Sequence, residues 1–274
     1  MLFARDPAKL RPGSWPGFVR CSPLQDFDAS AFELVINGIG AGDPARVASM
    51  GSAILGITSH WDDVILSGMG SGTHYVFLSS GAVYGGGFDR PVTWADTLAI
   101  SVNSIGAIPP YTIAKLYSEA KHRACAELPI LDLRIFGYAD EAIDRSGRFF
   151  LSELAKSVAD GSQFETSALD MTRDYAGCRE LADLIIAWRV SGAPNFTADL
   201  YTTAPVTKNE LLDVASTLFG IDVNRSNAAN FRAPTAAKTV YASANHAAET
   251  LGYTPKRSAL TIVLEMLRAI SAGR

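Results

Sequence analysis

The segment Phe77-Leu78-Ser79-Ser80-Gly81-Ala82-Val83-Tyr84-Gly85 and the later segment Pro109-Pro110-Tyr111-Thr112-Ile113-Ala114-Lys115 carry the most information in this chain. The first ends an apolar run typical of a buried strand and delivers a serine. The second opens on proline, which suits a helix start, and places Tyr111 and Lys115 on one helical face. A serine hydroxyl, a phenol and an ammonium group can together move a proton to or from a sugar hydroxyl while a nicotinamide exchanges a hydride.

Around these segments, apolar runs of strand length alternate with helical patterns. We predict strands at residues 32–36, 74–78 and 130–136, and helices at 44–66 and 111–127. After Gly137 we predict helices at 148–159, 179–189, 208–219, 243–251 and 258–270, with a strand at 200–203. The alternation favours an α/β fold with a Rossmann-like parallel sheet flanked by helices. We expect residues 1–137 to form the dinucleotide-binding region and 138–274 a smaller, mainly substrate-binding lobe, with some segments returning to the sheet.

The composition is that of an ordinary globular protein. The chain has 274 residues, of which 48% are hydrophobic and 19% charged, and its formal net charge is −4, so nucleic acid is not an expected partner. Cys21, Cys125 and Cys178 show no CxxC pairing and are expected to be free thiols in a reducing cytoplasm. The four histidines lack metal-ligand spacing, so no metal site is expected. Neither a membrane-spanning apolar run nor a signal peptide is recognisable, which predicts a cytoplasmic protein.

The Tyr-x-x-x-Lys spacing occurs twice on the same predicted helix. Tyr117 and Lys121 repeat it six residues after Tyr111 and Lys115, about 240° around the helix, so the two pairs cannot face one site. Tyr111 lies at the helix start, where the helix dipole and Lys115 favour a tyrosinate, and we predict a pKa below the ordinary value of about 10. Taken alone, the motif also fits an amphipathic helix with a half-buried tyrosine and a solvated lysine.

Together the two segments resemble the extended short-chain dehydrogenases/reductases, which are sugar-nucleotide epimerases, dehydratases and reductases. In that family a strand ends in Ser-Ser-x-x-Val-Tyr-Gly and a later helix begins Pro-Tyr-x-x-x-Lys. The likeness continues at residues 133–136, 172–175 and 251–255. The resemblance implies that Ser80 is the active-site serine, Tyr111 the acid/base and Lys115 its partner. It also implies a homodimer formed through the helix that carries the tyrosine.

The resemblance further implies an NAD(P) cofactor and a nucleotide-sugar substrate. The residues it assigns to the cofactor are Arg5, Asn37, Gly38, Gly40, Ser79, Tyr111 and Lys115, and those it assigns to the substrate are Ser80, Tyr84 and Arg173. A guanidinium suits the diphosphate of the substrate because it binds in a bidentate manner, although Arg173 equally fits a surface ion pair. Arg5 favours NADP over NAD, since arginine suits a 2′-phosphate, but Asp6 beside it leaves NAD open.

The chain departs from the family at its beginning, because the Gly-x-x-Gly-x-x-Gly turn that holds the cofactor phosphates is missing. Only Gly-x-Gly-x-Gly occurs, at residues 38–42 and 68–72, with the wrong spacing. By register, residues 2–5 match the family's second strand, so the first strand-helix unit, which includes a central strand, is expected to be missing. A gene model that starts at an internal methionine, an artefact of the expressed sequence and a diverged protein without cofactor binding would each explain this.

Two smaller departures bear on the reaction. Gly81 and Ala82 stand where the family's dehydratases have an acidic pair, which argues against 4,6-dehydration. Gly137 stands where epimerases often have an asparagine that contacts the substrate. We therefore expect an NAD(P)-dependent epimerase or reductase of a nucleotide-linked sugar. The alternatives are a non-catalytic relic that binds a ligand or partner, and a reductase of a small non-nucleotide carbonyl. The sugar, the nucleotide and the reaction direction stay open.

Overall fold

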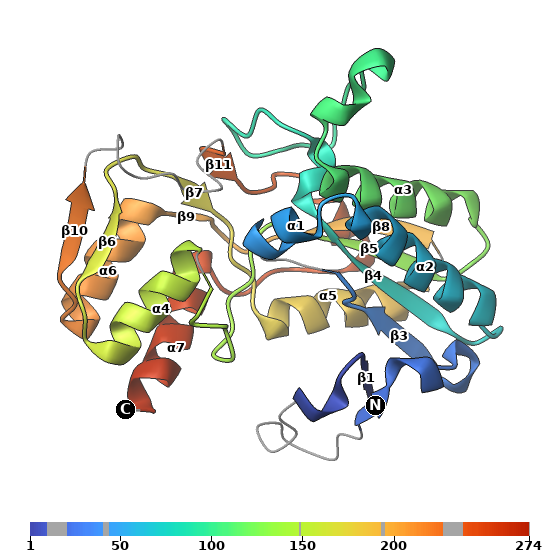
Figure 1. The fold of residues 1–274 in the computed structure, drawn as a ribbon, viewed down its shortest axis with the longest axis horizontal. Coiled ribbons are helices and arrows are strands. Elements are labelled where there is room, and N and C mark those ends of the chain that lie inside the picture. The colour runs from blue at the N-terminus through green and yellow to red at the C-terminus, as the bar shows by residue number, and fades with distance from the viewer. Residues whose placement is uncertain (10–20, 41–43, 148, 193–194, 227–237, 274) are drawn as a thin grey trace.

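A four-stranded parallel sheet forms the centre of the molecule (Figure 1). The computed structural model describes residues 1–9, 21–40, 44–147, 149–192, 195–226 and 238–273. The strand order is β3 (Leu34–Asn37), β4 (His74–Ser80), β5 (Ile130–Ile135) and β8 (Asn195–Leu200). Helices α2 (Ala53–Gly68) and α3 (Pro110–Ala124) cover one face, and α5 (Cys178–Ser191) covers the other. The predicted α/β fold with a helix-flanked parallel sheet is confirmed.

Strand β4 shows why its apolar run is continuous. Tyr75 and Phe77 pack on the α2 and α3 side, whereas Val76 packs on the α5 side beside Trp188, and all four side chains are fully buried. A parallel strand covered on both faces needs apolar residues at every position rather than at alternate ones. The carboxyl end of this strand carries Ser79 and Ser80, so the core packing places both serines at the ligand-binding edge of the sheet.

A second, two-stranded parallel sheet lies apart from the first. It pairs β1 (Leu2–Ala4) with β2 (Cys21–Pro23). Phe3 of β1 packs edge-on against the rings of Phe27 and Phe32, at 5.2 and 5.7 Å between centroids. Within the described residues no strand pairs with the outer edge of β3 or with the free edge of β1.

Glycine ends several helices. The predicted helix at 44–66 is divided into α1 (Pro44–Met50) and α2 by Gly51, whose φ is +52°. Helix α4 (Phe150–Asp160) ends at Gly161, which adopts the left-handed conformation, as does Gly192 after α5. Glycine has no Cβ and adopts this conformation without strain, so the glycine positions in the sequence determine where these helices end.

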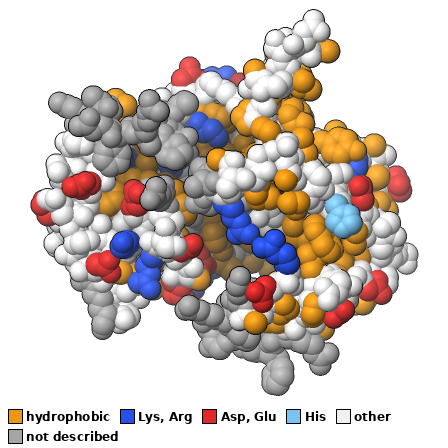
Figure 2. Space-filling model, viewed as in Figure 1, with side chains coloured by type: hydrophobic (Ala, Val, Ile, Leu, Met, Phe, Trp, Pro, Cys, Tyr) orange, Lys and Arg blue, Asp and Glu red, His pale blue; other side chains and the backbone are white. Residues whose placement is uncertain are grey.

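The lobe at the other end of the molecule is built from helices and short strands. Helices α4, α6 (Lys208–Phe219) and α7 (Ala259–Ala272) share one apolar core. One small sheet pairs β6 (Phe164–Ser167) with β10 (Val223–Ser226), and another has the order β11 (Val240–Tyr241), β7 (Thr172–Arg173) and β9 (Val206–Thr207). Strand β8 and helix α5 come from the same half of the chain but belong to the central sheet. Figure 2 shows a hollow between the two parts, with Lys and Arg side chains at its margin.

Two predicted elements are wrong in detail. The sequence predicts a strand at 200–203. In the structure, strand β8 ends at Leu200, so residues 201–203 lie after the strand. Ser243 does not cap a helix. Its hydroxyl donates a hydrogen bond to Asp199 at a distance of 2.5 Å and accepts one from the Asn245 amide. Only a short 3₁₀ turn, η8 (Ala247–Leu251), follows it.

The three cysteines form no disulfide. Among the described residues, no His, Cys, Asp and Glu side chains are grouped as a metal site requires. None of the helices in the described part of the chain is long and apolar enough to span a membrane.

Candidate active site

Ser80 is positioned by the turn that follows β4. Its hydroxyl accepts a hydrogen bond from the Ala82 amide at 3.2 Å and so caps the 3₁₀ turn η5 (Gly81–Tyr84). A Cβ on Gly81 would lie 2.5 Å from the ring of Phe136, so this turn has no room for a side chain there. The glycine found where dehydratases have an acidic residue is therefore required by packing. The turn holds the Ser80 hydroxyl at the edge of the sheet.

Helix α3 brings Tyr111 and Lys115 to the same place. Pro110 begins the helix, and the Tyr111 hydroxyl lies close enough to the Ser80 hydroxyl for Ser80 to influence its pKa. Lys115 is buried, and its ammonium donates to the Leu78 carbonyl at 2.7 Å and lies 4.4 Å from the centre of the Phe77 ring. The structure therefore brings the three predicted catalytic side chains together. The second pair faces elsewhere, as predicted, since Lys121 binds Asp62 and Asp63.

The prediction of a lowered Tyr111 pKa is wrong for this structure. Burial raises the pKa of Tyr111, because the phenolate would lose its hydration, and the hydrogen bond from Ser80 only partly opposes this effect. Lys115 does not compensate, since its ammonium is 5.8 Å from the centre of the Tyr111 ring and is bonded to Leu78. Burial also lowers the pKa of Lys115, to about 8.

Sequence reasoning missed a second phenol at the site, that of Tyr241. This residue lies on β11 of the lobe, and its hydroxyl is 3.2 Å from the Ser80 Oγ. The ammonium of Lys238 lies 3.9 Å from the centre of the Tyr241 ring and 4.6 Å from that of Phe88. No motif in the sequence marks Tyr241 or Lys238, which reach the site only through the pairing of β11 with β7.

Arg173 lies in β7 beside Tyr241, its register partner on β11. It is only 7% exposed, and its Nη1 donates to the carbonyls of Thr172 and Thr239 at 2.8 and 3.4 Å. Its Nη2 is buried without a hydrogen-bond partner. No carboxylate of the described residues forms a salt bridge with it, so the alternative of a surface ion pair is wrong. A buried guanidinium with an unused donor is suited to an anion.

Ser79 and Tyr84 belong to a buried polar network behind the site. The Ser79 hydroxyl donates to Glu119 at 2.6 Å, and Glu119 also pairs with Arg134. The Tyr84 hydroxyl donates to Asp199 at 2.9 Å and accepts from Arg134 at 3.0 Å. Burial and the Asp199 charge raise the pKa of Tyr84 to about 12. The predicted substrate contact of Tyr84 therefore has only the ring to use, since the hydroxyl is engaged within the protein.

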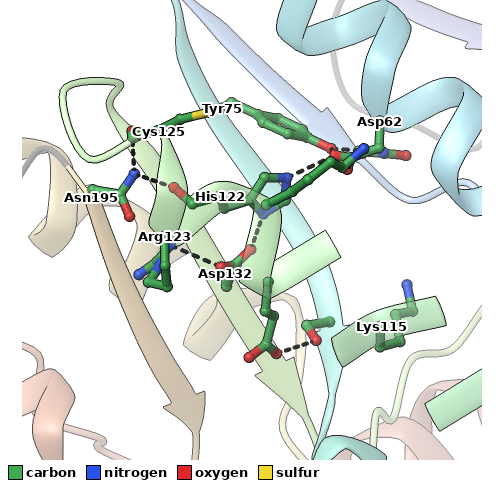
Figure 3. Close-up of polar contacts among 12 residues, drawn as sticks. Asp62, Tyr75, Lys115, His122, Arg123, Cys125, Asp132 and Asn195 are labelled. Atoms are coloured by element: carbon green, nitrogen blue, oxygen red, sulfur yellow. Dashed lines mark hydrogen bonds and ion pairs between the residues drawn. The ribbon is translucent and has the colours of Figure 1, made fainter. Parts of the chain in front are cut away.

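A network of buried charges lies between the central sheet and helices α2 and α3 (Figure 3). The His122 ring lies between two fully buried carboxylates, with Nδ1 2.5 Å from Asp132 and Nε2 2.7 Å from Asp62. Lys121 pairs with the other oxygen of Asp62, and Arg123 with the other oxygen of Asp132. Although burial opposes it, these bonds raise the pKa of His122 to about 9, so the ring is a cation. The scattered histidines gave no sequence signal for this role.

The residues predicted to hold the cofactor are not all brought together. Asn37 is buried at the end of β3, where it accepts from the Ile39 amide and donates to the Tyr75 hydroxyl, each at 2.9 Å. Gly38 and Gly40 follow it, and β3 pairs with β4, so this turn lies near Ser79 and Ser80. Arg5 is exposed on the separate β1–β2 sheet.

The structure also describes the second glycine-rich segment and Gly137, the residue that stands where epimerases often have an asparagine. Gly68–Gly72 precedes β4 and lies at the opposite end of the sheet, away from the site. Residues 41–42 of the first glycine-rich segment lie outside the described residues. A Cβ on Gly137 would come within 2.6 Å of the Asp174 carbonyl, so packing excludes an asparagine there.

The described residues fit an NAD(P) cofactor at one end only. Tyr111 and Lys115 are the polar groups that could hold a nicotinamide ribose, since the Ser79 hydroxyl is engaged by Glu119, and the Lys115 pKa of about 8 leaves its ammonium largely charged at neutral pH. At the other end, the glycine-rich segment that leads from β3 toward α1 lacks the Gly-x-x-Gly-x-x-Gly spacing that binds a dinucleotide pyrophosphate, and its residues 41–43 lie outside the described residues. The site thus fits the nicotinamide side and not the phosphate side.

No family model and no curated protein matches this chain by sequence. Solved structures match it throughout. A protein from Burkholderia cenocepacia J2315, described as a candidate epimerase, has a TM-score of 0.77 at 16% identity and covers 98% of this chain and 89% of its own. UDP-glucose-4-epimerase from Stenotrophomonas maltophila, with bound NAD and formylated UDP-arabinopyranose, has a TM-score of 0.72 at 18% identity, covering 89% and 78%. RMD from Pseudomonas aeruginosa, complexed with NADPH, has a TM-score of 0.68 at 17% identity. The match covers 88% of this chain and 81% of RMD.

These similarities confirm the predicted resemblance at the level of the fold. The neighbours include epimerases and a 4,6-dehydratase of sugar nucleotides, solved with NAD, UDP or UDP-sugars. At 14–19% identity, the shared architecture identifies the fold and leaves activity to be argued from the site.

Proposed function

We propose that this chain, which has the fold of the sugar-nucleotide epimerases and dehydratases, is an NAD(P)-dependent epimerase or reductase acting on a nucleotide-linked sugar. The observation that carries the proposal is the meeting of Ser80 and Tyr111 at the carboxyl edge of the sheet, with Lys115 one turn further along α3. A bound NAD(P) supplies or accepts the hydride, and the residues of this chain handle the proton.

The proton chemistry follows from burial. Because the pKa of Tyr111 is raised, its phenol keeps its proton at neutral pH and is suited to give it to a carbonyl oxygen. The Ser80 hydroxyl orients that oxygen by a hydrogen bond. The Lys115 ammonium is 5.8 Å from the centre of the Tyr111 ring and donates to the Leu78 carbonyl, so it does not lower the Tyr111 pKa here, and it would hold the ribose of a bound NAD(P). The raised pKa favours the reductive direction, with Tyr111 as the acid.

The experiment that tests the proposal is titration of the protein with NADPH and with NADH, followed by intrinsic tryptophan fluorescence. We expect saturable binding at micromolar concentrations, stronger for NADPH, because Arg5 follows β1 where a 2′-phosphate would be read. An Arg5→Ala variant should lose the preference for NADPH but still bind. Equal affinity for the two dinucleotides in the wild type would contradict the role of Arg5.

One observation favours a second candidate function, a ligand-binding or partner-binding protein without redox activity. The β1–β2 sheet stands apart from β3, and the phosphate seat of the dinucleotide is missing from the described residues. If neither dinucleotide binds in the titration while a nucleotide sugar does, this second function is supported and the first is rejected.

A homodimer formed through α2 and α3 belongs to the same proposal. Leu55 and Ile57 on α2 and Tyr117 on α3 are exposed, and Figure 2 shows hydrophobic side chains gathered over this side of the molecule. Burying such a surface would stabilise a dimer. We expect sedimentation to give twice the mass of one chain, and Tyr117→Glu to shift it toward the monomer. A monomeric wild type at micromolar concentration would refute this part of the proposal.

A further inference from the structure

A cavity lies beside strand β7, apart from the candidate active site. Asp174 directly follows β7, and its amide donates to the Tyr241 carbonyl, so the chain stays extended past Arg173. Successive side chains of an extended chain point to opposite faces. Arg173 acts on Tyr241 at the active site, whereas Asp174 lines a cavity of about 480 Å³. That volume is in the range of small-molecule sites.

The wall of this cavity carries negative charge. Asp174 and Glu249 are part of it, and no lysine or arginine is among the described residues that line it. Glu249 is exposed and lies 3.4 Å from the exposed ring of His246. Asp174, in contrast, is only 3% exposed. A buried carboxylate is unfavourable unless its charge is offset, so the partners of Asp174 decide what the cavity can hold.

Asp174 has hydrogen bonds but no cation. Its Oδ1 accepts from the Thr202 hydroxyl at 2.6 Å and its Oδ2 from the Thr202 amide at 3.1 Å, which leaves lone pairs free on both oxygens. No described cation forms a salt bridge with it, and the charge that acts on it is the negative charge of Glu180, which pairs with Arg257. Burial therefore raises the pKa of Asp174, and the bonds from Thr202 oppose this only in part.

A phenol in the same wall also lacks a partner. Tyr201 is 2% exposed and lines the cavity, and its hydroxyl has no hydrogen-bond partner among the described residues. Burial and the charge of Glu249 raise the pKa of Tyr201 to about 12, so the hydroxyl is near Glu249. A ligand that donates hydrogen bonds would give the phenol oxygen the partner that it lacks.

The remaining wall is largely apolar, because Pro91, Pro205 and Pro255 line it. A bare metal ion does not suit this cavity, since no His, Cys, Asp and Glu side chains of the described residues are grouped as a metal site requires. The cavity combines a buried carboxylate without a counterion, an unpartnered phenol and apolar surface. These features together fit a cation that carries a carbon chain.

We infer that this cavity binds a small organic ammonium ion, with the ammonium group held by Asp174 and Tyr201 and the carbon chain lying against the prolines. An ammonium has three donors, so it can serve the free lone pairs of the carboxylate and the phenol oxygen. Its charge offsets that of Asp174 in a place from which water is largely excluded. The inference goes beyond the proposed function and does not depend on it.

The test is a titration of the protein with n-butylammonium chloride, followed by NMR at the amide signals of Thr202 and Thr203. The Thr202 amide donates to Asp174, so it reports directly on the carboxylate. We expect a saturable shift with a dissociation constant in the millimolar range. n-Butanol has the same chain without the charge, and it should bind about tenfold more weakly or less, because charge-assisted hydrogen bonds are the stronger ones.

Two variants locate the site. Asp174→Asn removes the charge and keeps an oxygen for the Thr202 hydroxyl, and it should weaken n-butylammonium binding about tenfold or more. The matched control is Asp213→Asn, at an exposed carboxylate on α6 that pairs with Arg225, and it should bind as the wild type does. The thermal midpoint establishes that each variant is folded. Ala244 is exposed and lines the cavity, so Ala244→Leu should weaken binding by filling space even if Asp174→Asn does not fold.

Several results would overturn the inference. Equal affinity for n-butanol and n-butylammonium would show that the charge is not used. Binding by folded Asp174→Asn or Ala244→Leu that equals binding by the wild type would place the ammonium elsewhere. The same saturable shift with potassium chloride would identify a site for a bare cation. A wild type that binds NADPH but shows no saturable shift with n-butylammonium refutes this inference alone, and the reverse result refutes only the proposed function.

Discussion

Tyr111→Phe should lower turnover by roughly 10²–10⁴-fold, the range typical of a lost general acid. The substitution removes one oxygen atom, so the ring still fills its half-buried place at the start of α3. The hydroxyl is the group that lies beside Ser80, and because its pKa is raised it keeps its proton at neutral pH. Oxidation of NADPH and interconversion of sugars, followed across a panel of nucleotide sugars, would measure the effect.

The helix supplies its own control for this experiment. Tyr117 has the same spacing to a lysine, but it is 53% exposed and its lysine is held by Asp62 and Asp63. Tyr117→Phe should therefore leave turnover unchanged. Nucleotide-sugar binding should be similar in both variants, because the diphosphate is held elsewhere. Turnover of folded Tyr111→Phe equal to that of the wild type would refute the assignment of Tyr111.

His122→Gln should lower the free energy of unfolding by about 3–5 kcal/mol near pH 7, the usual cost of breaking a buried ion pair by removing one partner. The imidazolium lies between Asp62 and Asp132, whose side chains are fully buried, and glutamine cannot supply its charge. Denaturant unfolding measures the loss. His60→Gln, at an exposed position on α2, is the matched control and should cost little.

The pH dependence of the same network has a defined sign. Folding raises the pKa of His122 from about 6.5 in an unfolded chain to about 9, so the protonated ring stabilises the fold fully below pH 6.5. This contribution declines as the pH rises and is lost above about 9. The wild type should thus lose stability between pH 6.5 and 9, and His122→Gln should show little of that decline. A variant that loses less than about 1 kcal/mol at pH 7 would show that the ring is not the cation that joins the carboxylates.

Local spacing made part of the site predictable from sequence. Ser80, Tyr111 and Lys115 lie within two short motifs, and a strand end and a helix start fix where such residues point. The parallel sheet was predictable for the same reason, because continuous apolar runs and their spacing reflect burial on both faces.

The remainder depends on contacts that no local pattern encodes. Tyr241 and Lys238 reach Ser80 across a strand pairing in the lobe. The predicted direction of the Tyr111 pKa shift was wrong. The sequence indicates which charges lie nearby, but it does not show how strongly burial removes the hydroxyl from water. The role of His122 was not predictable from sequence, because its two partners are distant in the chain. Asp62 lies on helix α2 and Asp132 on strand β5, and these carboxylates keep the His122 ring charged.

The open edge of β3 has a consequence for the behaviour of the protein in solution. The outer edge of its four residues presents backbone donors and acceptors that meet no neighbouring strand in the described part of the chain, and Ile36, one of these residues, is 47% exposed. Such an edge can template the addition of a strand from another molecule. A segment that covered this edge would remove the template for such an addition.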